Sequence, residues 1–239
     1  MIKASKLDVT FPIFEKSSLS LRSTLAGQRT RREGGIRKFQ ALRGVTVVIE
    51  EGDRVGLLGH NGAGKSTFLR TLAGIYEPTG GSLEIRGEIK TMFEIGTGLD
   101  LDATGYENIP LIAAANQIRV RDMPALIADV EAFTELGEAL DSPMRTYSTG
   151  MRLRLAFAVT TAFPSDILLM DEVIGVGDNA FREKSRLRVE QMIDKAGTLV
   201  LASHSSAFLR TYCTRGLVFR AGEIAFDGAI EEAIALAAG

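Results

Sequence analysis

The sequence is poor in the residues that build disulfide frameworks and soft-metal centres. Cys213 is the only cysteine among 239 residues, histidine occurs twice, and tryptophan is absent. A single cysteine excludes an intrachain disulfide framework and a cysteine cluster for zinc or iron–sulfur chemistry. We therefore expect Cys213 to be a buried or idle thiol.

Long apolar runs and a large excess of charge of one sign are also missing. The opening stretch MIKASKLDVTF holds no apolar run of signal-peptide length, and no later run reaches the roughly 18 apolar residues that span a bilayer. The 28 basic and 30 acidic residues leave a net charge of -2, which gives no general attraction to nucleic acid. The sequence predicts a cytoplasmic protein that acts on a membrane only through a partner and binds no nucleic acid.

Short β-branched runs alternate with longer helical patterns along the chain. With 45% hydrophobic residues, the chain can bury the core of one large domain spanning 1–239. A helix is expected from about Ser66, and this alternation predicts an α/β fold with a mostly parallel sheet. The expected strand regions are 45–59, 82–87, 166–172, 197–204 and 216–228.

Residues 104–163 lack strand-like runs and show helical spacing instead. In MPALIADVEAFTELGEAL, apolar residues recur at steps of three and four, at Leu126, Val130, Phe133 and Leu136. We interpret this region as a helical subdomain inserted into an α/β core. The core would then consist of residues 1–103 and 164–239.

Residues 17–38, SSLSLRSTLAGQRTRREGGIRK, fit neither pattern. The segment is rich in serine, glycine and arginine, and a solvated loop between two strands is the favoured interpretation. The alternative is a basic contact with lipid headgroups or a membrane subunit. Its clustered cations are Arg29, Arg31, Arg32, Arg37 and Lys38.

The stretch GHNGAGKST, residues 59–67, matches the phosphate-binding pattern G-x-x-x-x-G-K-[S/T] between an apolar strand and a helix-compatible run. Its glycines let backbone N–H groups point at phosphate oxygens. Lys65 would neutralise charge on the β- and γ-phosphates, and Ser66 would ligate Mg²⁺. The candidate nucleotide-binding residues are Gly59, Asn61, Gly62, Ala63, Gly64, Lys65, Ser66 and Thr67, of which Lys65 is also a catalytic candidate.

Two further apolar strands end in candidate catalytic residues. DILLMDE ends in Asp171, a candidate metal ligand, and Glu172, a candidate base for an attacking water. Taken alone, these acids could equally be capping or surface residues. GTLVLASH ends in His204, and a lone histidine after a strand is more often structural. Its position after the two acids favours a catalytic role.

The stretch YSTGMRLRLAFA, residues 147–158, points to one family. Tyr147 to Met151 resemble the signature of ABC ATPases, usually written LSGGQ, and an amphipathic helix follows it. The resemblance covers essentially the whole chain: Walker A, signature, Walker B, a D-loop ending at Asp178 and His204 as the switch histidine occur in the family's order. It implies a P-loop NTPase core with a mostly parallel sheet, an N-terminal antiparallel β portion and the inserted helical subdomain.

Three features resemble ABC ATPases that export O-antigen, teichoic acid, capsule or cell-wall galactan. They are a signature of the form Y-S-[ST]-G-M, the phrase VTFPIF at 9–14, and EIGTGLDLDATGYENI at 94–109. The resemblance implies export of a lipid-linked polysaccharide. The alternatives are an ABC ATPase that exports another substrate or a non-transport soluble ABC ATPase. Because the chain stops at Gly239, we expect no C-terminal sugar-binding domain.

Two sites depart from the family's pattern or are left open by it. Other ABC exporters usually place a glutamine in the loop that enters the helical subdomain, and Glu94 is the nearest counterpart here, a candidate Mg²⁺ ligand. Phe14 fits best as the aromatic residue that stacks on adenine, with Phe11 and Phe39 as competitors. A core role is equally open for each of these rings.

The resemblance further implies a head-to-tail homodimer that uses ATP and Mg²⁺. ATP bound at 59–67 of one copy would be closed over by Ser148 and Gly150 of the other, and Asp178 would link the two sites. The helical subdomain would pass the closing motion to a membrane-spanning permease subunit. The protein would be peripheral on the cytoplasmic face of the inner (cytoplasmic) membrane, and it would handle the lipid-linked polysaccharide only indirectly.

Overall fold

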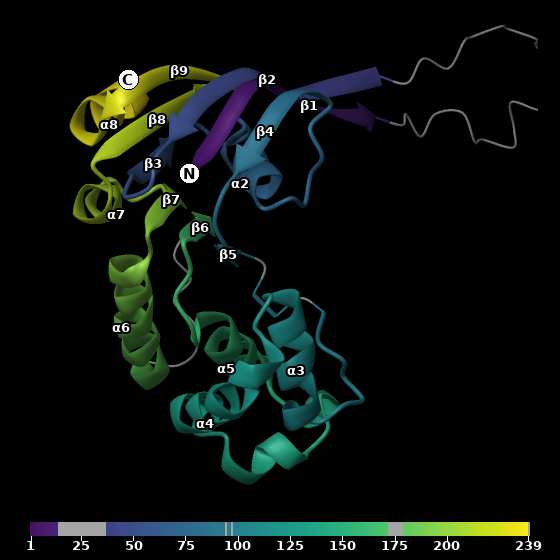
Figure 1. The fold of residues 1–239 in the computed structure, drawn as a ribbon. Coiled ribbons are helices and arrows are strands. Elements are labelled where there is room, and N and C mark those ends of the chain that lie inside the picture. Colours follow the sequence, from purple (N-terminus) through teal and green to yellow (C-terminus); the bar gives the residue numbers. More distant parts are fainter. Residues whose placement is uncertain (14–36, 94, 97, 172–178, 239) are drawn as a thin grey trace, which may run out of the picture.

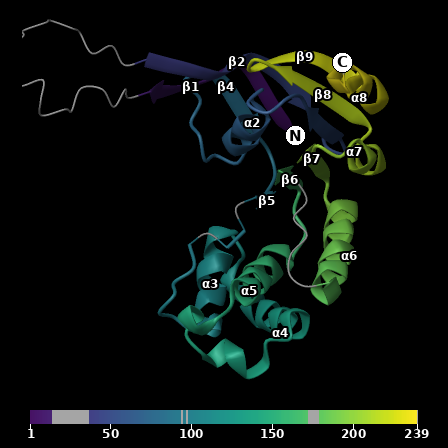
Figure 2. The same ribbon diagram turned by 180° about the vertical axis from the view of Figure 1, so that it is seen from behind.

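The computed structural model describes residues 1–13, 37–93, 95, 96, 98–171 and 179–238. Figure 1 shows an α/β part that contains both ends of the chain, with a group of helices below it. The same separation is visible from behind in Figure 2. The expected α/β fold with an inserted helical region is confirmed.

The larger sheet has six strands in the order β5-β6-β7-β3-β8-β9. The five strands from β5 to β8 run parallel, and β9 pairs antiparallel with β8. The strands are β5 Ile89–Met92, β6 Ile167–Asp171, β7 Thr198–Ala202, β3 Arg54–Leu58, β8 Arg215–Arg220 and β9 Glu223–Ala229. The mostly parallel sheet was expected, whereas β5 was not.

The smaller sheet is antiparallel, with strand order β2-β1-β4. Its strands are β1 Ile2–Ile13, β2 Arg37–Ile49 and β4 Gly80–Ile85. The interpretation of 17–38 as a loop is wrong at its end, because Arg37 and Lys38 begin β2 and pair with Ile13 and Pro12. Residues 14–36, including Arg29, Arg31 and Arg32, lie outside the described residues.

Helices join or cover the strands of the α/β part. They are α2 Lys65–Leu72, α6 Asn179–Lys195, α7 Ser206–Tyr212 and α8 Ile230–Ala238. Helix α2 lies next to the three-stranded sheet, whereas α7 and α8 lie beside β3, β8 and β9 (Figure 1). Both faces of the larger sheet are therefore covered, as a parallel sheet requires.

The central strands are apolar because each contributes to two core clusters. In β6, Ile167 and Leu169 belong to the cluster that also contains residues of β1, β2 and α2. Leu168 and Met170 belong to the cluster on the other face, which includes residues of α6. This alternation follows from the two-residue period of a strand.

The helical part contains α3 Gly105–Ala115, α4 Met123–Thr134 and α5 Thr149–Thr161, with short 3₁₀ turns η2 Val120–Asp122, η3 Gly137–Asp141 and η4 Met144–Thr146. The helical spacing expected through Leu136 breaks earlier, since Glu135 has φ 55 and starts the turn into η3. Among the residues that the structure describes, no helix combines the length and the apolar composition needed to cross a bilayer.

Helix α5 is partly exposed in its first half and buried throughout its second half. From Leu155 to Thr161 every residue is buried, because α5 packs against α3, α4 and α6. Phe157 in this stretch stacks on Phe133 of α4 and meets Phe181 of α6 edge to face. A helix enclosed on all sides needs no polar face, and the expected amphipathic pattern is therefore wrong for the second half.

Cys213 is buried, as expected from its isolation in the sequence. Burial raises the pKa of its thiol to about 12. The thiolate, the reactive form of cysteine, is therefore suppressed at neutral pH.

Lys90 is a buried cation on β5, at the junction of the sheet and the helical part. Only 6% of the residue is exposed, and its Nζ donates a hydrogen bond to the Phe163 carbonyl at 2.6 Å. Burial lowers the pKa of Lys90 to about 8, and the nearby Arg188 charge acts in the same direction. The bond ties β5 to the connection between α5 and β6.

This pKa predicts a pH dependence of stability. The folded protein releases the Lys90 proton near pH 8, whereas an unfolded lysine holds its proton to about pH 10.4. Because the unfolded state then binds more protons, the free energy of unfolding should rise from pH 8 toward pH 10. In Lys90→Met, the free energy of unfolding should rise less over this pH range, by an amount on the order of 3 kcal/mol.

The measurement is urea unfolding at several pH values between 7 and 10. Lys3→Met is the matched control, because Lys3 lies exposed on β1. Parallel stability curves for the wild type and Lys90→Met would contradict the lowered pKa.

Candidate nucleotide-binding site

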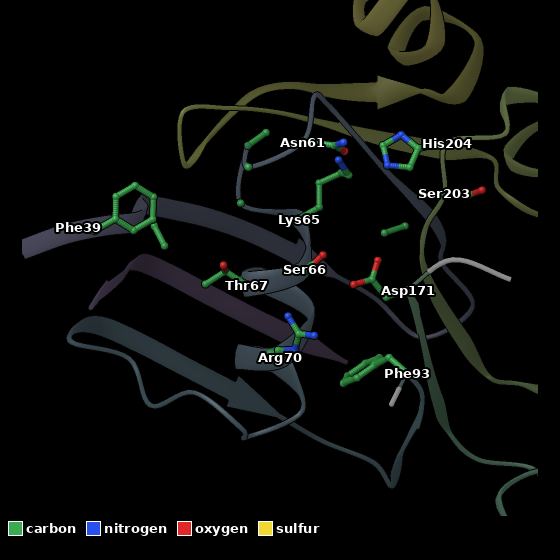
Figure 3. A pocket seen from close by; sticks show the side chains of 15 residues that line it. Phe39, Asn61, Lys65, Ser66, Thr67, Arg70, Phe93, Asp171, Ser203 and His204 are labelled. Carbon is green, nitrogen blue, oxygen red and sulfur yellow. The ribbon is translucent and has the colours of Figure 1, made fainter. Parts of the chain in front are cut away.

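Three neighbouring strands of the larger sheet end at one edge. Strand β3 leads into the loop 59–64, β6 ends in Asp171, and β7 is followed by Ser203 and His204. Because β6, β7 and β3 are parallel neighbours, their carboxyl ends meet, which is where α/β sheets bind ligands. A cavity of about 500 Å³ lies there (Figure 3), lined by Phe39, Ala41, Asn61, Gly62, Ala63, Gly64, Lys65, Ser66, Thr67, Arg70, Phe93, Asp171, Ala202, Ser203 and His204.

The loop that opens the cavity needs glycine for two different reasons. Gly59, Gly62 and Gly64 have φ values of 135°, 80° and 116°, a region that residues with a Cβ atom rarely adopt. A Cβ on Gly59 would lie 2.3 Å from the Phe219 carbonyl oxygen, and one on Gly64 would lie 3.1 Å from that of Ala41. Conformation and close packing together therefore require glycine at positions 59 and 64.

Lys65 is the first residue of α2, and its ammonium lies across the loop. Nζ donates hydrogen bonds to the carbonyls of Gly59 at 2.6 Å and His60 at 3.2 Å. The residue is buried, so its charge acts in a partly dehydrated setting. The first turn of α2 adds backbone N–H groups and the positive end of the helix dipole. This end of the cavity is built for a polyanion.

Ser66 and Asp171 supply oxygen atoms on the wall beside Lys65. Figure 3 shows both side chains reaching the same part of the cavity, Ser66 from α2 and Asp171 from the end of β6. A hydroxyl and a carboxylate are ligands that suit Mg²⁺ once phosphate oxygens complete the shell. In the part of the chain that the structure describes, no three His, Cys, Asp or Glu side chains gather into a metal site.

The aromatic candidates for adenine stacking fall in different places. Phe39 lines the cavity and is 50% exposed. Its partner across the β1–β2 ladder, Phe11, instead packs edge to face on Tyr76, with ring centroids 5.0 Å apart. Phe14 lies outside the described residues.

The structure adds Arg70, Phe93 and Ser203 to the expected residues. Arg70 lies four residues after Ser66 on α2, a helical spacing that puts both on one face and that can be read from the sequence. Phe93 comes directly after β5, the strand that sequence reasoning missed. Glu94, Glu172 and Asp178, like Phe14, are expected site residues that lie outside the described residues.

Ser148 and Gly150 are not among the residues that line this cavity. Ser148 caps α5, accepting a hydrogen bond from the Met151 N–H at 3.2 Å, and is exposed. Helix α5 belongs to the helical part and lies apart from α2 (Figure 1). One chain therefore does not bring its signature residues to its own phosphate-binding loop.

Comparisons with known proteins place the chain in a family. Residues 42–175 match the ABC transporter family. The O-antigen export system ATP-binding protein RfbE of Yersinia enterocolitica is 42% identical over 217 residues, which cover 89% of this chain and 90% of that protein. The teichoic acids export ATP-binding protein TagH of Lactococcus lactis is 33% identical over 98% of this chain, which spans 49% of that protein.

Solved structures agree on the fold. The dimeric post-hydrolysis structure of an ATP-binding cassette with ADP and Pi has a TM-score of 0.67 at 20% identity, covering 96% of this chain and 99% of that chain. An ATP-binding subunit of an ABC transporter has a TM-score of 0.68 at 21% identity, covering 97% of this chain and 90% of that chain. The family match and the relative of 42% identity show that the chain belongs to the ABC transporter family.

Proposed function

We propose that the chain hydrolyses ATP to power export of a lipid-linked polysaccharide across the cytoplasmic membrane. The observation that carries this proposal is that Lys65, Ser66, Asp171 and His204 line one cavity at the start of α2. The names of the relatives supply the cargo class, since they belong to O-antigen and teichoic acid export systems.

The phosphate end of ATP would bind at the N-terminus of α2. The loop's backbone N–H groups and Lys65 would hold the β- and γ-phosphates, and Lys65 would stabilise the charge that develops on transfer. Ser66 and Asp171 would hold Mg²⁺, with Glu94 as a further candidate ligand. The metal would neutralise phosphate charge when bound.

Glu172 would orient and deprotonate the attacking water, because it directly follows Asp171 at the end of β6. His204 follows the adjacent strand β7 and lines the same cavity, which supports its contact with the γ-phosphate. Asp178, downstream of Glu172, would link the two sites of a dimer.

Adenine would stack on an aromatic side chain at the far end of the cavity from His204. Phe39 is supported by its half-exposed place in the cavity wall (Figure 3), and Phe14 stays a candidate from the sequence. Phe11 is disfavoured, because its ring already packs against Tyr76.

A second copy of the chain would complete the site in a head-to-tail homodimer. Ser148 and Gly150 lie at the start of α5, which is apart from α2 (Figure 1), and neither lines the cavity of its own chain; this supports an arrangement in which they contact the γ-phosphate of the other copy. Closure would be driven by ATP and reversed on hydrolysis. The helical part would pass the motion to a membrane-spanning permease subunit, which places the protein at the cytoplasmic face of the inner membrane.

Gly64→Ala should weaken ATP binding to the separate subunit about tenfold or more, because the loop must leave its left-handed conformation and move from Ala41. Gly74→Ala is the matched control. Gly74 also has positive φ, at 74°, but a Cβ there meets open space. Fluorescent-nucleotide titration and thermal unfolding of both variants make the comparison. Equal ATP affinities for the two variants would contradict the packing argument.

Glu172→Gln should bind ATP, form a persistent dimer and turn over about 10²–10⁴-fold more slowly, because glutamine cannot accept the water proton. Phosphate release measures turnover, and size-exclusion chromatography with ATP measures the dimer. Hydrolysis at the wild-type rate would remove Glu172 as the base.

In the source cell, Lys65→Ala should abolish the surface polymer and cause lipid-linked polysaccharide to accumulate on the cytoplasmic side, because the phosphate grip is lost. Glycolipid extraction and surface labelling measure the two pools. Lys3→Ala, an exposed lysine on β1, is the control. An unchanged surface polymer would withdraw the polysaccharide cargo and leave another exported substrate or a non-transport ATPase.

A further inference from the structure

The segment just before the signature is bound to a second segment of the helical part. Residues 143–147 run beside 101–104, with the Met144 N–H bonded to the Ala103 carbonyl at 2.8 Å. The Arg145 N–H bonds to the Leu101 carbonyl, also at 2.8 Å. Thr104 and Pro143 form an isolated antiparallel bridge. The signature therefore starts from a pinned backbone.

The partner segment is itself held from inside by Asn108. This side chain is fully buried and bonds to Asp100 twice, as donor and as acceptor, each at 2.9 Å. Its Nδ2 also donates to the Thr104 carbonyl at 2.8 Å. A buried amide with its partners satisfied makes the turn at 100–104 rigid.

Tyr147, the first residue of the signature, also holds this region together. The residue is 4% exposed, and its hydroxyl donates a short hydrogen bond to the Ala139 carbonyl in η3. A Cβ added to Gly105, the first residue of α3, would lie 2.4 Å from that hydroxyl oxygen. Burial raises the pKa of Tyr147, so the hydroxyl remains a donor at neutral pH. Tyr147 thus fills a space that Gly105 leaves open.

Ser148 follows Tyr147 directly and caps α5. Arg152, on the first turn of α5, binds the backbone that precedes Tyr147. Arg152 Nε donates to the Met144 carbonyl at 3.1 Å, and its Nη2 donates to the Arg145 carbonyl at 3.2 Å. Ser148, the second residue of the signature, therefore lies between two side chains, those of Tyr147 and Arg152, that hold the backbone before it.

We propose that Tyr147 is a positioning residue that sets the signature residues Ser148 and Gly150 for their contact with ATP of the partner copy. It acts by anchoring the signature to η3 and to the start of α3. The leucine of the general LSGGQ signature could fill part of this space but could not make the hydrogen bond. The inference rests on the proposed head-to-tail homodimer.

The test measures the ATP-bound dimer of the full chain in the Glu172→Gln background, by analytical ultracentrifugation across protein concentrations. Tyr147→Phe should raise the dimer dissociation constant about tenfold, because both signatures lose the bond that orders them in the separate subunit and must be ordered on closure. Tyr147→Leu should do the same. ATP affinity of the separate subunit should not change, since Tyr147 does not line the cavity.

Tyr106→Phe is the matched control. Its hydroxyl also bonds within the helical part, at 2.6 Å, but its partner is Glu131 on α4 and not a residue that holds the signature. Gly105→Ala is a second route to the same effect, because its methyl group would displace the Tyr147 hydroxyl. Folding of Tyr147→Phe should survive, since the Ala139 carbonyl keeps its bond from the Ser142 N–H.

Ser148→Ala tests the proposed dimer contact separately from the positioning role of Tyr147. A weaker dimer for Ser148→Ala, Tyr147→Phe and Gly105→Ala, with Tyr106→Phe unchanged, would support the positioning role. If Ser148→Ala weakens the dimer but Tyr147→Phe has the same dimer dissociation constant as Tyr106→Phe, the positioning role is overturned. The proposed dimer is then still supported. An unchanged Ser148→Ala dimer would overturn the proposed contact and this inference with it. A lower melting temperature without a shift in the dimer would assign Tyr147 to stability alone.

Discussion

The parallel pairing of β6, β7 and β3 is the constraint on which the site depends. It sets Asp171 opposite Ala202 and brings the loop after β3 to the same edge. A slip of one residue would turn Asp171 to the other face of the sheet and carry the buried strand residues with it. The register is held because both faces are packed, by one core cluster each. Packing far from the cavity therefore positions its chemistry.

The same architecture leaves the signature outside the cavity. The rings of Phe133 on α4 and Phe157 on α5 stack on each other and both contact Phe181 on α6 of the α/β part, and Lys90 on β5 bonds to Phe163. The helical part and one face of the larger sheet share one core cluster, so a movement of the helical part also changes its contacts with α6. In the proposed head-to-tail homodimer, a site shared between two copies would make ATP part of the contact between them. ATP hydrolysis and movement of the helical part would then be coupled.

How much of the fold could be predicted depended on how regular each strand is. Strands β3, β6 and β7 are short apolar runs and were all predicted. Strand β1 was expected only as the strand before the loop at 17–38 and as part of the N-terminal antiparallel portion that the resemblance implies. Its own residues do not show it, because Lys6 has φ 47 and the pairing shifts between Ala4 and Leu7, which breaks the two-residue alternation. Strand β5 has only four residues, and Lys90 among them is buried through a bond to Phe163, a partner that no local pattern reveals.

The cavity itself was more predictable than its surroundings, for a physical reason. A phosphate grip needs glycine conformations and a helix start within one short stretch, so its chemistry is local and the motif at 59–67 describes it. The support of the signature is not local: Tyr147 depends on Gly105 and Ala139, which are distant or unremarkable in the sequence. The motif alone does not distinguish the roles of Tyr147 and Ser148. Tyr147 is buried and bonded within the helical part, whereas Ser148 is exposed, so packing constrains the first residue and not the second.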